Sequence, residues 1–176
     1  MMKKERNEKW FAVYTKYKCE KLVLERLLKK DIKAYLPLLQ KTRKYGKRIR
    51  HNSVPLINCY VFVNVANSEF VKVLETENVI GFLKIGNELI AIPNREIKIL
   101  KTVVGEIKDD IELSTEEITI GETVEIISGN LTGMKGSFLG KSGKKNFQIE
   151  LNHIGYNLLI QVDPSILRRI SNFAKV

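Results

Sequence analysis

The chain has little of what most metal and redox sites are built from. Its 176 residues include two histidines and two cysteines, Cys19 and Cys59, and the cysteines form neither a CxxC pair nor a group with a histidine. Protein metal sites usually bring such residues together at short, regular spacings. We therefore expect no metal site, and we expect both thiols to stay reduced in the cytoplasm.

The motifs of common enzyme classes are missing as well. The sequence contains no GxSxG nucleophile turn, no GxxxxGK[ST] phosphate loop and no HExxH pair. His51 lies in a basic segment and His153 in a predicted turn, and neither has further metal ligands at a recognisable spacing. Because nothing converges on a reaction centre, we expect a protein that is not an enzyme and that uses no cofactor.

Long hydrophobic runs are also absent. No run reaches the ~18 apolar residues that a membrane span needs, and no signal-peptide-like apolar stretch follows the charged residues 1–8. Apolar residues still make up 44% of the chain, which is enough to build a core. We expect a cytoplasmic, globular protein with one medium domain or two small ones.

The positive charge is concentrated at one end of the chain. Residues 1–50 carry 17 Lys and Arg against 5 Asp and Glu, whereas residues 51–176 carry 13 against 15. A localised basic surface attracts a nucleic-acid backbone by releasing its counterions. We interpret the basic part as a nucleic-acid contact. The alternative is a solvated, lysine-rich surface that binds nothing.

The pattern of elements indicates two domains. Up to residue 105, short apolar strands alternate with amphipathic helices, predicted at 17–30 and 94–104. Residues 106–118 are acidic and lack periodicity, which indicates a linker. Later strands are short and punctuated by glycines, as in a small barrel, although they could instead extend the first sheet. The predicted ranges are 8–105 for the first domain, 106–118 for the linker and 119–172 for the second domain.

Two predicted strands of the first domain carry aromatic residues on one face. Alternate residues of a strand share a face, so Trp10 and Tyr14 lie together on strand 10–15, and Tyr60 and Phe62 lie together on strand 59–65. If these strands are neighbours, the rings form one patch. Between them, residues 41–51 (KTRKYGKRIRH) predict a basic hairpin that turns at Gly46. Further strands are predicted at 34–39, 81–83 and 89–92.

In this order, the segments resemble NusG-type transcription factors. WFAVYT at 10–15, followed by a helix with Glu20, resembles the start of the NGN domain. GKR at 46–48, PLINCYVFV at 55–63 and VIGFL at 79–83 resemble its hairpin and later strands, and GETVEI at 121–126 resembles a KOW motif. The resemblance covers residues 9–171. It implies an α+β fold: an NGN domain, with an antiparallel sheet and flanking helices, followed by a small SH3-like all-β KOW barrel.

The resemblance also implies a function. The protein would be a monomeric transcription elongation or antitermination factor that docks on the clamp helices of the largest catalytic subunit of RNA polymerase and contacts non-template DNA. Its KOW domain would recruit a ribosomal protein or Rho. The sequence looks closer to UpxY/RfaH-like paralogs, which act at selected operons such as those for polysaccharide biosynthesis, than to general NusG. One departure is Asn58-Cys59, where the family often has Pro-Gly or Pro-Asn before the signature tyrosine.

Three sets of site residues follow from the resemblance. The rings could instead belong to the core, an alternative that is strongest for Trp10 and Phe82, whereas the hydroxyls of Tyr14 and Tyr60 favour a wet or partnered edge. The predicted polymerase-binding residues are Trp10, Tyr14, Ile57, Tyr60, Phe62 and Phe82. The predicted nucleic-acid-binding residues are Lys16, Lys18, Lys41, Arg43, Lys44, Lys47, Arg48 and Arg50. The predicted KOW glycines are Gly121, Gly129, Gly133 and Gly136.

Two other functions remain open at the level of sequence. One is a general, housekeeping NusG. The other is a structural, RNA-binding KOW protein of the ribosome, which accounts for the positive charge and the barrel but leaves the aromatic first domain unexplained.

Overall fold

The structure is a computed structural model that describes residues 7–107, 111–115, 121–140 and 144–170. The chain forms two compact units, one from residues 1–38 and 53–97 and the other from residues 39–52 and 98–176. Among the described residues, no helix is long and apolar enough to cross a membrane.

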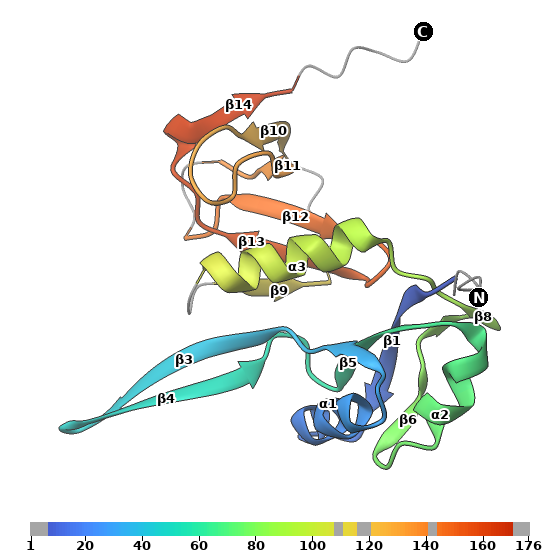
Figure 1. The fold of residues 1–176 in the computed structure, drawn as a ribbon. Helices are drawn as coiled ribbons and strands as arrows, with labels where there is room; N and C mark the ends of the chain where they lie inside the picture. The colour runs from blue at the N-terminus through green and yellow to red at the C-terminus, as the bar shows by residue number, and fades with distance from the viewer. Residues whose placement is uncertain (1–6, 108–110, 116–120, 141–143, 171–176) are drawn as a thin grey trace, which may run out of the picture. The chain divides into compact units, whose positions relative to one another are not determined.

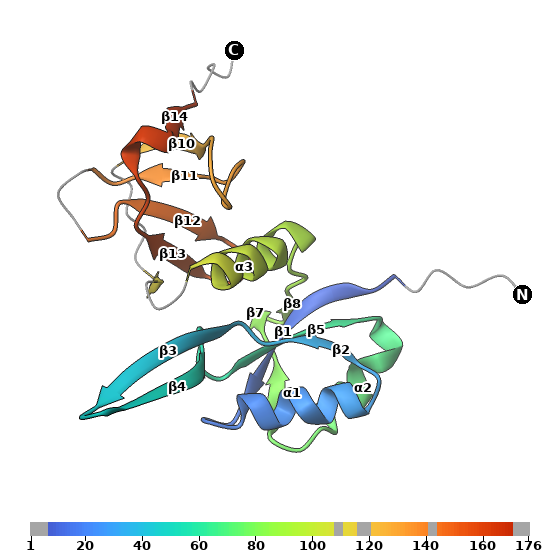
Figure 2. The same cartoon turned by 60° about the vertical axis from the view of Figure 1, so that its left-hand side comes forward.

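The first unit is an antiparallel sheet with two helices against one face (Figures 1 and 2). Its strands lie in the order β2-β5-β1-β6. The short 3-10 turn η1 precedes α2, and the small hairpin of β7 and β8 follows β6. The bounds are β1 Lys9–Thr15, α1 Glu20–Lys29, β2 Lys33–Tyr35, β5 Tyr60–Val65, η1 Asn67–Glu69, α2 Phe70–Leu74, β6 Val79–Phe82, β7 Lys84–Ile85 and β8 Glu88–Leu89.

The core of the first unit lies between the helices and one face of the sheet. Phe11 and Val13 of β1 and Val63 of β5 face this core. Val23 and Leu27 are four apart, so they share one side of α1, and both are fully buried. Burying a side chain of this size contributes roughly 1.5–3 kcal/mol relative to exposing it. The apolar spacing in the sequence therefore decides which side of α1 meets the sheet.

The predicted basic hairpin is confirmed, and it forms a two-stranded sheet of its own. Its strands are β3 Leu38–Tyr45 and β4 Arg48–Pro55, and Gly46 turns between them with a φ of +58°. A two-residue hairpin turn requires such a positive φ at its first central residue. The strand predicted at 34–39 is split, because β2 ends at Tyr35 and Pro37 has no N–H to donate to a ladder.

The second unit contains a six-stranded antiparallel sheet in the order β14-β10-β11-β12-β13-β9. Residues 98–106 of helix α3 also belong to this unit. Buried apolar residues from β10, β12 and β13, such as Ile126, Phe147 and Leu158, form its core. This all-β region fits the KOW barrel expected from the sequence. The bounds are α3 Asn94–Glu106, β9 Glu112–Ser114, β10 Glu122–Ile126, β11 Lys135–Phe138, β12 Phe147–Leu151, β13 Tyr156–Ile160, η2 Pro164–Ile166 and β14 Leu167–Arg169.

The boundary between the units differs from the predicted linker. Glu112–Ser114, inside the predicted acidic segment, forms β9 and pairs with β13. Leu113 lies opposite Leu158, so the segment contributes one apolar cross-strand pair. Strand β9 lies at the edge of the sheet, where one side remains open to solvent, and charged residues are common in such strands. Residues 108–110 and 116–118 of the predicted linker lie outside the described residues.

The four predicted KOW glycines occupy positions where a side chain is unfavourable. A Cβ on Gly136 would lie 2.2 Å from the main-chain oxygen of Gln148 on the neighbouring strand, and one on Gly121 would lie 2.6 Å from a main-chain oxygen of β11. Gly129 and Gly133 have φ values of +84° and +86°. Close strand approach and positive φ are the two reasons for which a chain needs glycine.

We expect Gly136→Ala to destabilise the second unit by about 1–3 kcal/mol, because main chain rather than a flexible side chain must move to admit the methyl group. The matched control is Gly105→Ala, the same chemical change in α3, where a Cβ meets nothing within 4 Å. That control should be neutral or more stable, since alanine is the better helix former. Chemical denaturation of both variants measures the difference, and equal midpoints would contradict the prediction.

Candidate docking face and basic hairpin

The face of the first sheet that points away from the helices carries aromatic side chains. Strands β1 and β5 are neighbours, with Tyr14 opposite Tyr60 and Ala12 opposite Phe62. Because Phe11 and Val13 face the helices, the alternate residues of β1 face the other way. In β2, Tyr35 lies opposite Phe62 and joins this set. We call this set the aromatic face; its members are Trp10, Tyr14, Tyr35, Tyr60 and Phe62.

Most of the aromatic face is covered. Trp10 is 5% exposed, Tyr60 8% and Phe62 0%, while Tyr14 and Tyr35 are half-buried. The Tyr35 and Phe62 rings stack with centroids 6.4 Å apart, and burial raises the pKa of Tyr35 to about 12. Tyr35 is not among the predicted site residues, although it lies in a predicted strand. The buried rings pack beside the pair of tyrosines, and Tyr14 offers a more accessible ring than Trp10, Tyr60 or Phe62.

Of the residues predicted to bind polymerase, Phe82 does not lie on this face and Ile57 is buried. Phe82 pairs with Val13 rather than with Tyr14, so its ring joins the helix-side core, 5.9 Å from the ring of Phe11. A register shift between Tyr14 and Thr15 sets this pairing, and sequence alone does not reveal it. Ile57 precedes β5 and is 1% exposed. The structure therefore assigns the Phe82 side chain to packing, whereas the role of Ile57 stays a prediction.

Tyr14 and Tyr60 form a hydrogen-bonded pair. The Tyr60 hydroxyl donates to the Tyr14 hydroxyl at 2.6 Å, and the ring centroids are 4.5 Å apart. A phenolic hydroxyl both donates and accepts. Tyr14 accepts within the pair, and its own proton has no acceptor among the described residues. The pair thus offers a hydrogen-bond donor at a half-buried position on the aromatic face.

The residue before Tyr60 has an unusual backbone. Cys59 has a φ of +63°, a conformation that costs a residue other than glycine roughly 1–3 kcal/mol. Two hydrogen bonds hold the turn: the Cys59 N–H donates to Oε1 of Glu20 at 2.7 Å, and the Thr15 N–H donates to the Cys59 carbonyl at 2.9 Å. The Asn58-Cys59 departure from the family pattern therefore lies at a position that still requires left-handed backbone.

The environment of Cys59 does not activate its thiol. Burial raises the pKa of the Cys59 thiol, and negative charge on Glu20 and Cys19 raises it further. A raised pKa leaves less of the reactive thiolate at neutral pH. Both cysteines are free thiols. Within the described ranges, no group of three or more His, Cys, Asp and Glu side chains is placed to hold a metal ion.

A basic loop follows β1 directly. Lys16, Tyr17 and Lys18 are exposed, and Tyr17 is 66% accessible. The Lys18 ammonium lies 5.2 Å from the centre of the Tyr17 ring. Because this loop begins two residues after Tyr14, the predicted DNA-binding residues Lys16 and Lys18 lie at the same end of β1 as the tyrosine pair.

The hairpin carries the other predicted nucleic-acid-binding residues, and residues 40–52 are all exposed. The Thr42 hydroxyl and Nδ1 of His51 are 3.0 Å apart, as expected for residues that face each other across a turn at 46–47. This register gives the ribbon one strongly basic face. Lys41, Arg43, Tyr45, Arg48 and Arg50 share that face, and Thr42, Lys44, Ile49 and His51 share the other.

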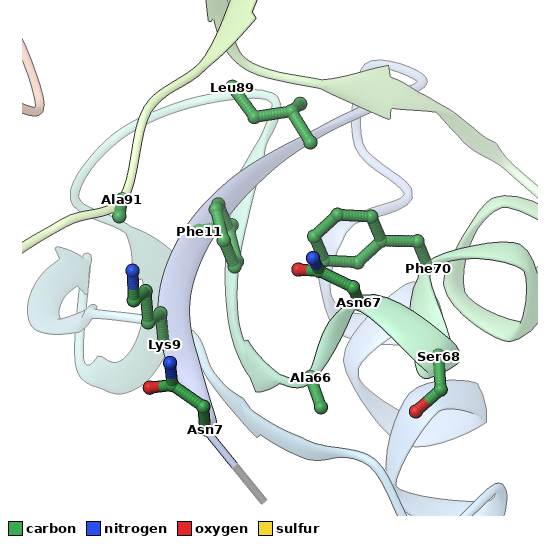
Figure 3. Close-up of a pocket in the computed structure, with 9 residues that line it drawn as sticks. All are labelled: Asn7, Lys9, Phe11, Ala66, Asn67, Ser68, Phe70, Leu89 and Ala91. Atoms are coloured by element: carbon green, nitrogen blue, oxygen red, sulfur yellow. The ribbon is translucent and has the colours of Figure 1, made fainter.

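A pocket of about 550 Å³ lies elsewhere in the first unit (Figure 3). Phe11, Phe70 and Leu89 line its apolar part, and among the described residues Lys9 is the one ionisable side chain that lines it. None of the predicted site residues lines this pocket. A single lysine without an acid or base partner provides no catalytic pair.

Together, the helix-backed sheet, the basic ribbon and the separate small β-sheet unit define an NGN–KOW protein of the class that works in transcription. A sequence model described as "Transcription termination factor nusG" matches residues 8–101. This match covers more than half of the chain, and the protein belongs to the NusG family.

Among solved structures, a NusG structure shows the same fold. NusG of Thermotoga maritima, in a structure described as "Domain interaction in Thermotoga maritima NusG", aligns with a TM-score of 0.56 at 21% identity, over 94% of this chain and 98% of that chain. The MjSpt4:Spt5 complex in conformation B aligns with a TM-score of 0.34 at 19% identity, over 94% of this chain and 99% of that chain. No curated protein matches the chain.

We expect Cys59→Gly to stabilise the protein by about 1 kcal/mol, because glycine adopts positive φ without the Cβ penalty. Cys59→Ala is the matched control, since it removes the thiol but keeps the Cβ. Urea unfolding of the three proteins separates the two effects. If alanine stabilised as much as glycine, the thiol rather than the backbone would be the source of the cost.

Proposed function

We propose that this protein is a transcription elongation and antitermination factor that docks on RNA polymerase through the Tyr14–Tyr60 pair and holds non-template DNA with its basic segments. The observation that carries the proposal is the tyrosine pair, with an unused hydroxyl donor, at the same end of β1 as the exposed loop from Lys16 to Lys18. In this proposal the protein acts by binding alone and catalyses no reaction.

The docking partner is the pair of clamp helices of the largest catalytic polymerase subunit. Tyrosine is enriched among residues that dominate binding energy, because one ring supplies both apolar area and a polar group. Trp10 and Phe62 lie on the same face of the sheet as the pair, and both rings are buried. On the edge strand β6, Ile80 is 67% exposed and adjoins Gly81, which pairs with Tyr14. It supplies apolar surface at the rim of the proposed contact.

The DNA contact rests on the charge of the hairpin. Lys41, Arg43, Lys44, Lys47, Arg48 and Arg50 are exposed, and residues 39–55 contain no acidic side chain to neutralise them. Binding a phosphate backbone releases counterions and relieves the repulsion among these cations. A factor bound to both polymerase and the non-template strand disfavours pausing, and its KOW domain would recruit a ribosomal protein or Rho.

Within the family, we propose a specialised, UpxY/RfaH-like paralog that acts at selected operons such as those for polysaccharide biosynthesis. The support is the resemblance in sequence, including the departure at Asn58-Cys59. A general NusG is the alternative. The genomic neighbourhood separates the two, because a secreted-polysaccharide operon favours the specialised factor and ribosomal-protein genes favour the general one.

Tyr14→Phe should weaken binding to RNA polymerase by about 3–10-fold, the value of one lost hydrogen bond. Tyr60→Phe is the matched control: both variants lose the bond between the hydroxyls and keep both rings, but only Tyr60→Phe keeps the Tyr14 hydroxyl. We therefore expect the larger loss for Tyr14→Phe in a titration with purified polymerase.

Both variants lose the bond between the hydroxyls and keep both rings, so both should remain folded. Unchanged polymerase binding by Tyr14→Phe would rule out this hydroxyl as the anchor. Loss of the fold in either variant would assign the pair to the core instead.

Reversal of Arg43, Lys44, Lys47 and Arg48 to Glu should weaken binding to a polymerase elongation complex and flatten its salt dependence. Each lost phosphate contact lowers the slope of log K against log salt by roughly 0.7–0.9, so the slope should fall by about 3 if all four residues contact phosphates.

The control for this variant carries the same change of charge elsewhere on the surface. Reversal of the exposed residues Lys72, Lys84, Arg95 and Lys144 to Glu lowers the net charge equally but leaves the hairpin intact. Its salt slope should remain close to that of the unaltered protein. If the two variants had equal slopes, the effect would come from net charge and not from contacts of the hairpin.

A further inference from the structure

We infer that Glu20 is a positioning residue that sets the geometry of the Tyr14–Tyr60 pair. The inference rests on the proposed function, in which this pair docks on polymerase, and it assigns what holds the pair in its binding geometry. Glu20 is in the first turn of α1, on a different element from either tyrosine.

The carboxyl group of Glu20 is buried and directed at one turn. The residue is 3% exposed, and its Oε1 accepts the Cys59 N–H at 2.7 Å. Burying a charged group is costly unless it is compensated, and the first turn of a helix favours negative charge. An apolar residue would fill this site at lower cost if packing were its only task. The choice of an acid therefore points to the hydrogen bond with Cys59.

The left-handed backbone of Cys59 depends on hydrogen bonds from residues outside the turn. Its φ of +63° is unfavourable for a residue with a Cβ, so the isolated turn would relax toward negative φ. Such a relaxation would rotate the backbone just before Tyr60. The bond from Glu20 restrains the N–H side of Cys59, and the bond from Thr15 restrains its carbonyl. The turn is thus fixed on both sides.

The same two bonds bracket the tyrosines. Tyr60 follows Cys59 and Tyr14 precedes Thr15, so each bond holds a neighbour of one tyrosine. On its other side, β1 pairs with β6, and the register of this pairing shifts between Tyr14 and Thr15. The pairing with β6 therefore restrains the end of β1 less regularly than the pairing with β5 does. The β1–β5 ladder places the two tyrosines opposite each other, and the turn that Glu20 holds fixes the end of this ladder, where the hydroxyls meet at 2.6 Å.

The test is a double-mutant cycle between Glu20 and Cys59. Glu20→Ala and Glu20→Gln are made in the unaltered protein, and Glu20→Ala is also made in the Cys59→Gly background. Each variant is titrated with purified RNA polymerase. In the free protein, carbon-13 labelled tyrosine reports the ring environments of Tyr14 and Tyr60 by NMR.

We expect Glu20→Ala to weaken polymerase binding by up to about tenfold, the same upper limit as for loss of the Tyr14 hydroxyl that it positions. Glu20→Gln keeps an acceptor, so the loss should stay below about threefold. With Cys59→Gly present, glycine adopts the turn unaided and Glu20→Ala should again cost less than about threefold. The Tyr14 and Tyr60 signals should shift in Glu20→Ala and return in the double variant.

Equal losses in both backgrounds would overturn the inference, and so would unchanged tyrosine signals in Glu20→Ala. If Glu20→Ala fails to fold while the double variant folds and binds polymerase, the strained turn is the site of action and the inference stands. If both fail to fold, Glu20 is a structural residue and the inference is wrong.

The NMR arm distinguishes this inference from the docking proposal. Tyrosine signals in the free protein do not depend on polymerase. If Tyr14→Phe leaves polymerase affinity unchanged while Glu20→Ala still shifts the tyrosine signals and Cys59→Gly restores them, docking through the pair fails and the positioning role remains.

Discussion

The antiparallel register between β1 and β5 is the constraint on which the candidate site depends. With Tyr14 opposite Tyr60, alternate residues of both strands face either the helices or the aromatic face. A slip by one residue would exchange the two faces and put valines in place of the rings. The buried contacts of Phe11 and Val63 with the helices resist that slip. Packing on one face of the sheet therefore determines which chemistry the other face presents.

The hairpin follows a different rule, because its exposed part has no core to direct it. Its residues from 40 to 52 are all exposed, and its cations repel one another. Salt largely screens the repulsion between exposed charges that are more than roughly 10 Å apart. The hairpin can therefore form without a partner. The repulsion stays available as a driving force for binding an anionic polymer. The first sheet and the hairpin thus contribute in different ways: the sheet offers shape and hydrogen bonds, and the hairpin offers charge.

Local patterns in the sequence predicted the features that depend on neighbouring residues. Alternation placed Trp10 and Tyr14 on one face, and Gly46 marked the hairpin turn; the structure agrees with both. The misplaced features depend on long-range pairing. The sequence predicts Phe82 in a strand but not its pairing partner on β1. In the structure the register shifts between Tyr14 and Thr15, and Phe82 pairs with Val13 and faces the core. Likewise, the acidic composition around Glu112–Ser114 gives no sign that β13 leaves an edge for it to pair with.

Gly136 and Cys59 occupy positions that favour glycine for two different reasons, and only the position of Cys59 is occupied by another residue. At Gly136, a Cβ would overlap main chain of the adjacent strand, and no hydrogen bond can remove that overlap. At Cys59, the penalty is conformational, so bonds to the turn from Glu20 and Thr15 can offset it. A residue other than glycine can therefore occupy a position of positive φ when a buried acceptor, here Glu20, binds its N–H. It makes the turn before Tyr60 depend on a residue in α1, and this dependence couples the helix to the proposed docking surface.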